Sequence, residues 1–337
     1  MIEFQNVSKY YRNNPAVCGL SLHIEEGETF GLIGTSGCGK TTTLKLINRL
    51  VDPTSGNIRV NGKDNGSVPL AELRRSIGYV IQDGGLFPHY SVEENIAIVP
   101  HLLGWNEDEI QSRNRELLEM VGLEADTFAA RMPGSLSGGQ QQRIGIARAL
   151  AADPPIILMD EPFGALDPIT KREIRSEVTQ IFEHISKTIV LVTHDVFEAF
   201  EMCDRLCLLD EGKIQQVGSP KELLFRPVND FGRSFFEDNR FQLEMYSITI
   251  GDIYQTICQS DKIESSAFGN RDSGLELSEE CLSAVKRSTP FFQALKQAEN
   301  DYVWLVGEDY EPIAQLSNEQ LLEGFQEVCR KLRGRGE

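Results

Sequence analysis

Short apolar runs alternate along the chain with segments whose apolar residues recur every three or four positions. The runs at 29–33, 156–159 and 188–193 are short and either apolar or β-branched, which is typical of buried strands. Between such runs, residues 107–121 place their apolar side chains on one helical face. Strands separated by helices predict an α/β fold around a mostly parallel sheet.

The same patterns divide the chain into regions. Polar turns bound further short strands, which we place at 2–7, 18–24, 57–60, 76–81, 205–209 and 213–217. Residues 84–150 are mainly helical and predict an insertion into the α/β unit. We expect a first domain over 1–240 and a small α+β domain over 241–337.

Composition excludes some functions. The 337 residues carry a formal net charge of −18, which opposes binding to nucleic acid, because phosphate backbones need a basic surface. Seven cysteines occur without a C-x-x-C pair, so we expect reduced thiols in a cytoplasmic protein. No apolar run reaches the roughly 18 residues of a membrane span, and the N-terminus does not resemble a signal peptide.

A glycine-rich stretch follows the first buried run and opens a helix. It fits the phosphate-binding pattern G-x-x-x-x-G-K-[ST] with Gly34, Thr35, Ser36, Gly37, Cys38, Gly39, Lys40 and Thr41, and the helix continues through Thr42. Glycines let successive backbone N–H groups turn towards phosphate oxygens, and the helix N-terminus adds positive partial charge. Lys40 supplies a full charge for the phosphates, and the Thr41 hydroxyl is placed for Mg²⁺.

Polar side chains follow three more strands. Asp160 and Glu161 end the run at 156–159, Gln82 follows 76–81, and His194 follows 188–193. Because ligands of parallel sheets bind at the carboxyl ends of strands, we expect these groups to converge on one nucleotide. Asp160 would help hold Mg²⁺ and Glu161 would polarise the attacking water. Taken alone, Gln82 and His194 fit a structural role as well as a phosphate or metal contact.

A second anion site lies further along. Residues 136–143 begin with a leucine and then Ser137, Gly138, Gly139 and Gln140, which open another helix. One nucleotide has one γ-phosphate, already cradled by the first loop, so this site is best used on a nucleotide bound by another copy. Tyr11, before the first loop, has two open roles: stacking on a base, or packing at a strand end.

With these motifs in order, the chain resembles the ATP-binding subunits of ABC transporters over about residues 1–240. The resemblance implies a P-loop NTPase fold with an N-terminal antiparallel β subdomain, ATP and Mg²⁺ as cofactors, and a dimer of two copies. It assigns Gln82 to the Q-loop and the metal, Asp167 to the D-loop beside the nucleotide, and His194 to the switch histidine. It also places Tyr11 at the adenine-stacking position.

A closer resemblance, over 45–56 and 72–105, is to the ATPases of importers for glycine betaine, carnitine, choline or proline. It implies two permease subunits in the membrane, an extracytoplasmic substrate-binding protein reached through them, and a peripheral location on the cytoplasmic face. Asp83 departs from the glutamine common in that group, and Cys38 replaces a common serine. Alternatives are another importer, an exporter, or a soluble ABC ATPase acting on nucleic acid, which the acidic charge opposes.

The last hundred residues resemble a single CBS module. The segment 248–253 resembles its opening, 290–298 its helix, 302–306 and 313–316 its strands, and 319–325 its closing helix. An irregular stretch lies at 264–278. For this segment we favour a dimerising or vestigial role over ligand binding or ionic-strength sensing. The terminal cluster of Arg330, Lys331, Arg333 and Arg335 is expected to be a solvated tail rather than a lipid contact.

Overall fold

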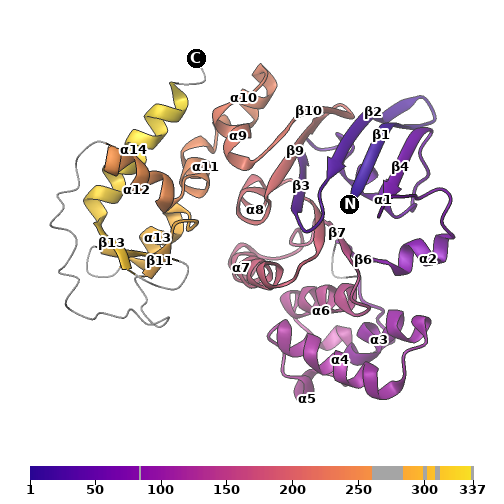
Figure 1. Ribbon diagram of the computed structural model, residues 1–337. Helices are drawn as coiled ribbons and strands as arrows, with labels where there is room; N and C mark the ends of the chain where they lie inside the picture. The colour runs from indigo at the N-terminus through magenta and orange to yellow at the C-terminus, as the bar shows by residue number, and fades with distance from the viewer. Residues whose placement is uncertain (83–84, 260–283, 299–301, 308–311, 335–337) are drawn as a thin grey trace. The chain divides into compact units, whose positions relative to one another are not determined.

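The structure is a computed structural model that describes residues 1–82, 85–259, 284–298, 302–307 and 312–334 (Figure 1). Two compact units divide the chain, Met1–Ser219 and Pro220–Glu337. The expectations for Asp83, for 264–278 and for Arg335 fall outside the described residues. Within the described parts of the chain, no helix has the length and apolar character needed to cross a bilayer.

The first unit begins with an antiparallel sheet. Its strands have the order β2-β1-β4-β5, with bounds Asn14–Ile24, Ile2–Tyr11, Ser55–Val60 and Lys63–Asp64. Ile2, Phe4 and Val7 of β1 are buried, and an irregularity after Phe4 shifts the alternation of buried and exposed side chains. Both β1 and β2 are longer than predicted, because the turn between them is tight and pairing continues to Tyr11 opposite Asn14.

The second sheet of this unit is six-stranded, with the order β10-β9-β3-β8-β7-β6. The bounds are β3 Thr29–Gly34, β6 Ile77–Val80, β7 Ile156–Asp160, β8 Thr188–Val192, β9 Arg205–Asp210 and β10 Lys213–Gly218. Only β10 pairs in the antiparallel sense. Every residue of β7 and β8 is buried, as their unbroken apolar pattern requires. The parallel arrangement brings the carboxyl ends of β3, β6, β7 and β8 to one edge.

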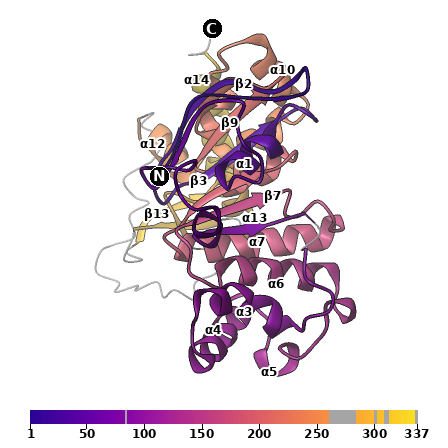
Figure 2. The same cartoon turned by 90° about the vertical axis from the view of Figure 1, so that its right-hand side faces the viewer.

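Helices cover this sheet and form the predicted insertion. The helices of the first unit are α1 Lys40–Ile47, α2 Leu70–Arg75, α3 Val92–Leu103, α4 Glu107–Met120, α5 Ala125–Phe128, α6 Gly138–Leu150, α7 Pro168–His184 and α8 Val196–Met202, with a 3₁₀ turn η1 at Pro133–Ser135. Helices α3 to α6 gather at one side of the unit (Figure 2). Reciprocal side-chain caps start three of them, Ser91 with Glu94, Asn106 with Glu109, and Ser137 with Gln140.

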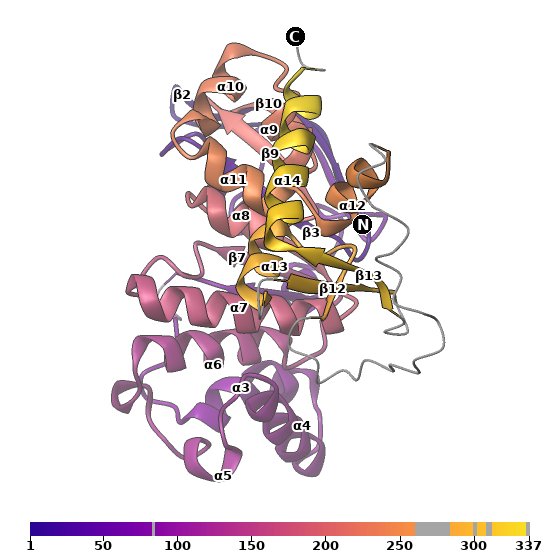
Figure 3. The same ribbon diagram turned by 90° about the vertical axis from the view of Figure 1, so that its left-hand side faces the viewer.

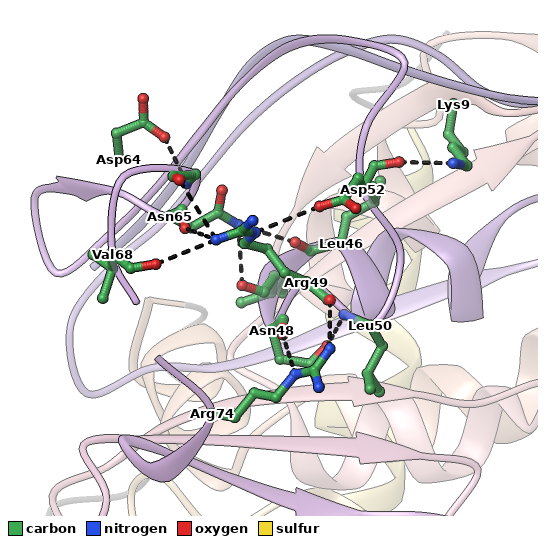
Figure 4. A network of polar contacts seen from close by, with 12 residues as sticks. Lys9, Leu46, Asn48, Arg49, Leu50, Asp52, Asp64, Asn65, Val68 and Arg74 are labelled. Carbon is green, nitrogen blue, oxygen red and sulfur yellow. Dashed lines mark hydrogen bonds and ion pairs between the residues drawn. The ribbon is translucent and has the colours of Figure 1, made fainter. Parts of the chain in front are cut away.

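Side chains from a later segment close the C-terminal end of α1 (Figure 4). The Asn65 Nδ2 donates to the carbonyl oxygens of Leu46 and Ile47 at 3.0 and 3.2 Å. Arg74 donates to the carbonyl oxygens of Asn48 and Arg49, just past the helix, at 3.3 and 2.7 Å. Arg49 in turn donates to the Asn65 and Val68 carbonyls at 3.1 and 3.2 Å. Because a helix end leaves its last carbonyls unsatisfied, this network holds α1, and the glycine loop before it, in place.

The second unit is a small α+β fold (Figure 3). Its elements are α9 Pro220–Phe225, α10 Asp230–Glu237, α11 Arg240–Ser247, α12 Ile250–Gln259, β11 Ala284–Lys286, α13 Phe291–Gln297, β12 Tyr302–Val306, β13 Pro312–Ser317 and α14 Asn318–Arg333. The sheet has the order β11-β12-β13, parallel and then antiparallel. One face buries Val285, Val303, Leu305, Ala314 and Leu316.

Two boundaries differ from the sequence analysis. Helix α14 runs eight residues past the predicted end at 325, because Val328 and Cys329 are also buried and extend its apolar face. The compact boundary lies between Ser219 and Pro220, since α9 and α10 pack with α11. The division at residue 240 remains a functional prediction.

Candidate nucleotide and catalytic site

The glycine loop crosses from β3 to α1 along a path that only glycine can follow at two points. Gly34 has φ +145°, and a Cβ there would lie 2.0 Å from the Leu209 carbonyl oxygen. Gly39 has φ +106°, and a Cβ there would lie 2.2 Å from the carbonyl oxygen of Ala16. A side chain at either position would meet rigid backbone as well as a disfavoured dihedral angle.

Lys40 lies at the start of α1 with its ammonium turned back into the loop. Its Nζ donates to the carbonyl oxygens of Gly34 at 3.0 Å and Thr35 at 2.8 Å, and lies 3.8 Å from the Cys38 Sγ. The lysine is only 6% exposed. These partners are neutral, so the ammonium keeps its positive charge available to an anion entering the loop.

An open cavity of about 450 Å³ lies in front of the loop. It is lined by Ala16, Ser36, Gly37, Gly39, Lys40, Thr41, Thr42, Glu161 and His194. The structure therefore brings loop residues together with two side chains from distant strand ends. Ala16 escaped the sequence analysis, because an alanine in a strand carries no chemical signal.

Asp160 at the end of β7 receives three groups. The Thr41 hydroxyl donates to its Oδ1 at 2.9 Å, and the Tyr79 hydroxyl donates to its Oδ2 at 3.4 Å. The Lys45 Nζ lies 3.8 Å from the same Oδ2. Burial, and then the charge of Asp160, raise the pKa of Tyr79 well above its usual value, so its hydroxyl stays protonated. Neither Tyr79 nor Lys45 was foreseen, since nothing in the sequence relates them to Asp160.

The oxygen donors of Asp160 and Thr41 fit Mg²⁺. Hard oxygen ligands suit this ion, which usually keeps several waters and binds substrate phosphates as well. Among the described residues, no group of three or more His, Cys, Asp or Glu side chains could hold a metal unaided. Asp160 and Thr41 are the residues that would hold such an ion beside the phosphates of a nucleotide.

Glu161, His194 and Gln82 converge at this edge. The Glu161 Oε2 lies 3.1 Å from the His194 Nδ1. Glu161 has φ +47°, a left-handed backbone conformation that is costly for a residue with a side chain and is typical of functional sites. A Cβ at Gly164 would lie 3.6 Å from the Gln82 Nε2 and 3.7 Å from the Glu161 Oε2. Gln82 thus approaches the same carboxylate.

The serine and glycines of the second anion site open α6 as expected, but they do not line this cavity. Ser137 and Gln140 cap the helix, with the Gln140 N–H donating to the Ser137 Oγ at 3.3 Å. A Cβ at Gly139 would lie 2.6 Å from the Ile174 Cδ1, so a side chain there would displace Ile174 of α7. The structure gives Gln140 and Gly139 local roles. A nucleotide contact from Ser137–Gln140 remains a prediction.

Other predicted site residues also lie outside the cavity lining, namely Tyr11, Gly34, Thr35, Cys38, Gln82, Asp160 and Asp167. Asp167 caps α7, accepting from the N–H groups of Ile169 at 3.1 Å and Thr170 at 3.2 Å. Hydrogen bonds from Thr170 lower the pKa of Asp167. Tyr11 is 47% exposed, and the Lys9 Nζ lies 5.2 Å from the centre of its ring. The Thr35 hydroxyl donates to the Asp210 Oδ1 at 2.9 Å.

Comparisons with known proteins bear on this geometry. Residues 17–164 match a family model described as ABC transporter. The chain is 51% identical over 248 residues to the glycine betaine uptake system ATP-binding protein YehX of Escherichia coli strain K12, covering 74% of this chain and 80% of that protein. It is 50% identical over 241 residues to the glycine betaine/carnitine/choline transport ATP-binding protein OpuCA of Bacillus subtilis strain 168, covering 71% of this chain and 63% of that protein.

A solved structure is similar as well. It is a dimeric ATP-binding cassette in a post-hydrolysis state, bound to ADP and Pi. The TM-score is 0.59 at 36% identity, and the match covers 65% of this chain and 98% of that one. With the sheets described above, this likeness confirms the predicted P-loop fold, its antiparallel N-terminal sheet and its small C-terminal unit.

Proposed function

The chain belongs to the ABC transporter family and is an ATPase of that family, and from this premise we propose that it energises import of a quaternary-amine osmoprotectant. Glycine betaine, carnitine and choline are the solutes we favour. The observation that carries the proposal is the identity of 51% across 80% of a glycine betaine uptake protein. The nucleotide site described above supplies the chemistry such a subunit needs.

Each catalytic group has a task set by its position. The loop N–H groups and the Lys40 ammonium bind the β- and γ-phosphates. The Glu161 carboxylate accepts a hydrogen bond from the attacking water and orients it, while His194 holds that carboxylate and faces the γ-phosphate. Asp160, Thr41 and Gln82 would hold Mg²⁺, which neutralises charge on the phosphates when bound. Tyr11 stacks on the adenine.

Two copies complete each site in this proposal. Residues 34–41 of one copy and 137–140 of the other enclose one ATP, with Asp167 beside it. Two observations support a homodimer: 137–140 does not line the cavity of its own chain, and the similar solved cassette is dimeric. ATP binding would close the pair and hydrolysis would reopen it.

The permease partner has a candidate docking surface. An open cavity of about 690 Å³ is lined by Phe87, Pro88, His89, Tyr90, Glu94, Ile98, His101 and Leu102. Phe87 and Leu102 are 51% and 56% exposed and line the same cavity, and a contiguous exposed apolar patch is typical of an interaction site. We assign this surface to a permease helix. The subunit would lie peripherally on the cytoplasmic face of the membrane and reach an extracytoplasmic substrate-binding protein through the permease.

The domain roles follow from this arrangement. Residues 1–240 form the nucleotide-binding domain, with the helical subdomain over 84–150 carrying the permease surface. Residues 241–337 act as a regulatory or dimerising module. The β11, α13, β12, β13, α14 order of the second unit is compatible with one CBS-like module.

Reconstitution tests the proposal. The chain is co-expressed with the permease genes beside its own and placed in vesicles with ATP on the side of this subunit. We expect ATP-dependent accumulation of labelled glycine betaine, competed by choline or carnitine and absent with Glu161→Gln. Accumulation of spermidine instead would indicate another importer, and outward movement of solute an exporter. Stimulation of ATP hydrolysis by RNA or DNA, without any permease, would favour the nucleic-acid alternative.

A further inference from the structure

A charged cluster lies behind the catalytic edge, where α7 meets α8. Lys171, in the first turns of α7, has its Nζ 2.9 Å from the Asp195 Oδ2 and 2.6 Å from the Glu198 Oε1. Its side chain is 19% exposed and that of Glu198 is 3% exposed. A lysine between two carboxylates at this depth is fixed in position, because each partner would be costly to leave unpaired.

Both sequence neighbours of His194 belong to this cluster: Thr193 binds Glu198, and Asp195 binds Lys171 directly. The Thr193 hydroxyl donates to the Glu198 Oε2 in a short hydrogen bond. The Asp195 N–H donates to the Thr193 Oγ1 at 3.0 Å, and the Asp195 carboxylate caps α8. The residues before and after His194 are therefore tied to groups that Lys171 binds.

The backbone of Lys171 connects to the other side of the site. Its N–H donates to the Asp167 carbonyl oxygen at 2.9 Å, one turn from the Asp167 side chain that caps the same helix. Burial lowers the pKa of Lys171, but its bonds to Glu198 and Asp195 outweigh burial and raise the pKa above its usual value. The ammonium therefore stays charged at physiological pH.

Other ion pairs along α7 lack this connection. Arg175 pairs with Glu201 at 2.7 Å, and Arg143 of α6 pairs with Glu177. Neither acidic partner flanks a residue that lines the nucleotide cavity. Lys171 joins the turn capped by Asp167 to the loop that carries His194, whose Nδ1 lies 3.1 Å from the Glu161 carboxylate.

We infer that Lys171 is a positioning residue of the ATPase site, which fixes the His194 loop to the first turn of α7. The inference rests on the proposed function, in which His194 faces the γ-phosphate. When the helix turn at Asp167 moves, the clamp carries the His194 loop with it. Loss of the clamp should therefore weaken interactions specific to the γ-phosphate and leave the rest of nucleotide binding intact.

The test compares four variants of the full chain. Lys171→Met removes the charge at similar length, and Lys171→Arg keeps it. The matched control is Lys187→Met, because the Lys187 side chain is 17% exposed and pairs with Asp153 at 2.8 Å, at the amino-terminal end of β8. Affinities for AMP-PNP and for ADP are measured by equilibrium binding, kcat by phosphate release, and Tm by calorimetry, with His194→Ala alongside.

We expect Lys171→Met to lower kcat by about tenfold or more and to weaken AMP-PNP about fivefold while ADP binding is retained. Lys171→Arg should keep most of the parent kcat and of the parent AMP-PNP affinity. Lys187→Met should leave both quantities unchanged. Equal loss of AMP-PNP and ADP affinity, or a fall in Tm without a change in their ratio, would mean that Lys171 only stabilises the fold. If His194→Ala shifts the ratio of AMP-PNP affinity to ADP affinity and Lys171→Met does not, the clamp is refuted while the proposed role of His194 stands. If His194→Ala also leaves the ratio unchanged, the proposed role of His194 fails and the clamp falls with it.

Discussion

Two carboxylates, one in each unit, sit in opposite settings. Glu161 in the first unit has a side chain 26% exposed, a left-handed backbone and a hydrogen bond to His194, and it lines an open cavity. Glu244 in the second unit is fully buried on α11. Arg240 Nε lies 3.2 Å and Arg333 Nε 2.9 Å from its Oε1, and the Cys329 Sγ lies 3.7 Å from its Oε2.

The difference separates the carboxylate to which we assign the chemistry from one that completes the fold. Around Glu244, hydrogen bonds to the carboxylate raise the pKa of Arg333, and burial with the charge of Glu244 raises the pKa of Cys329 to about 12. The Glu244 carboxylate is therefore occupied by arginine side chains of its own unit. Glu161 instead lines the cavity, with a left-handed backbone whose N–H donates to the Val192 carbonyl oxygen at 2.9 Å.

The largest expected effect concerns Glu161. Glu161→Gln keeps the size of the side chain but removes the charge that polarises water, so ATP hydrolysis should fall by about a hundredfold or more. Binding of ATP should remain, because the phosphates are held by the loop and Lys40. Phosphate release and equilibrium ATP binding measure the two effects, and gel filtration with ATP should show a trapped dimer. Hydrolysis at the parent rate would remove Glu161 from the mechanism.

Glu244→Gln is the matched change in the other unit. It removes the buried charge that Arg240 and Arg333 share, and leaves Arg240 only the exposed Glu237 at 3.8 Å. The free energy of unfolding of the second unit should fall by about 2–3 kcal/mol, less than for a fully enclosed pair because Arg333 is half-exposed. In a Trp105→Phe background Trp304 is the sole tryptophan, and its fluorescence in urea reports this unit. ATP hydrolysis at low temperature should be unchanged. Slower ATP hydrolysis by Glu244→Gln, without a lower free energy of unfolding, would show that Glu244 is not a purely structural group.

The smallest expected effect is at Cys38. Its thiol is buried, and burial, opposed by Lys40, raises its pKa above the usual value. The thiol is therefore protonated at pH 7.5, and its reactive thiolate increases only as pH rises above the ordinary cysteine range. Iodoacetamide should modify exposed Cys258 first at pH 7.5, as followed by peptide mass spectrometry. Cys38→Ser should keep ATP hydrolysis within about twofold, since the side chain is not a phosphate donor. Modification of Cys38 as fast as Cys258 would contradict this.

The sequence by itself determined the fold class and the family. A glycine loop between a buried strand and a helix is a local arrangement, because the glycines, the lysine and the helix start are consecutive. The runs that form β7 and β8 are apolar throughout because both faces are covered, so they were readable as central strands. Roles for Gln82, Asp167 and His194 came from the resemblance to the family, because an isolated Gln, Asp or His does not indicate a function.

Only the tertiary structure decided which side chains meet. Glu161 and His194 are 33 residues apart, and their contact exists because parallel strands end at one edge of the sheet. Tyr79 meets Asp160 because β6 and β7 are neighbouring strands, and Lys171 lies between Asp195 and Glu198 because α7 packs on α8. No local pattern encodes either contact. The burial of Glu244 likewise required α14 to cover α11 and deliver Arg333 from 89 residues away. Local order specifies elements, whereas the partners of a charge follow from how those elements pack.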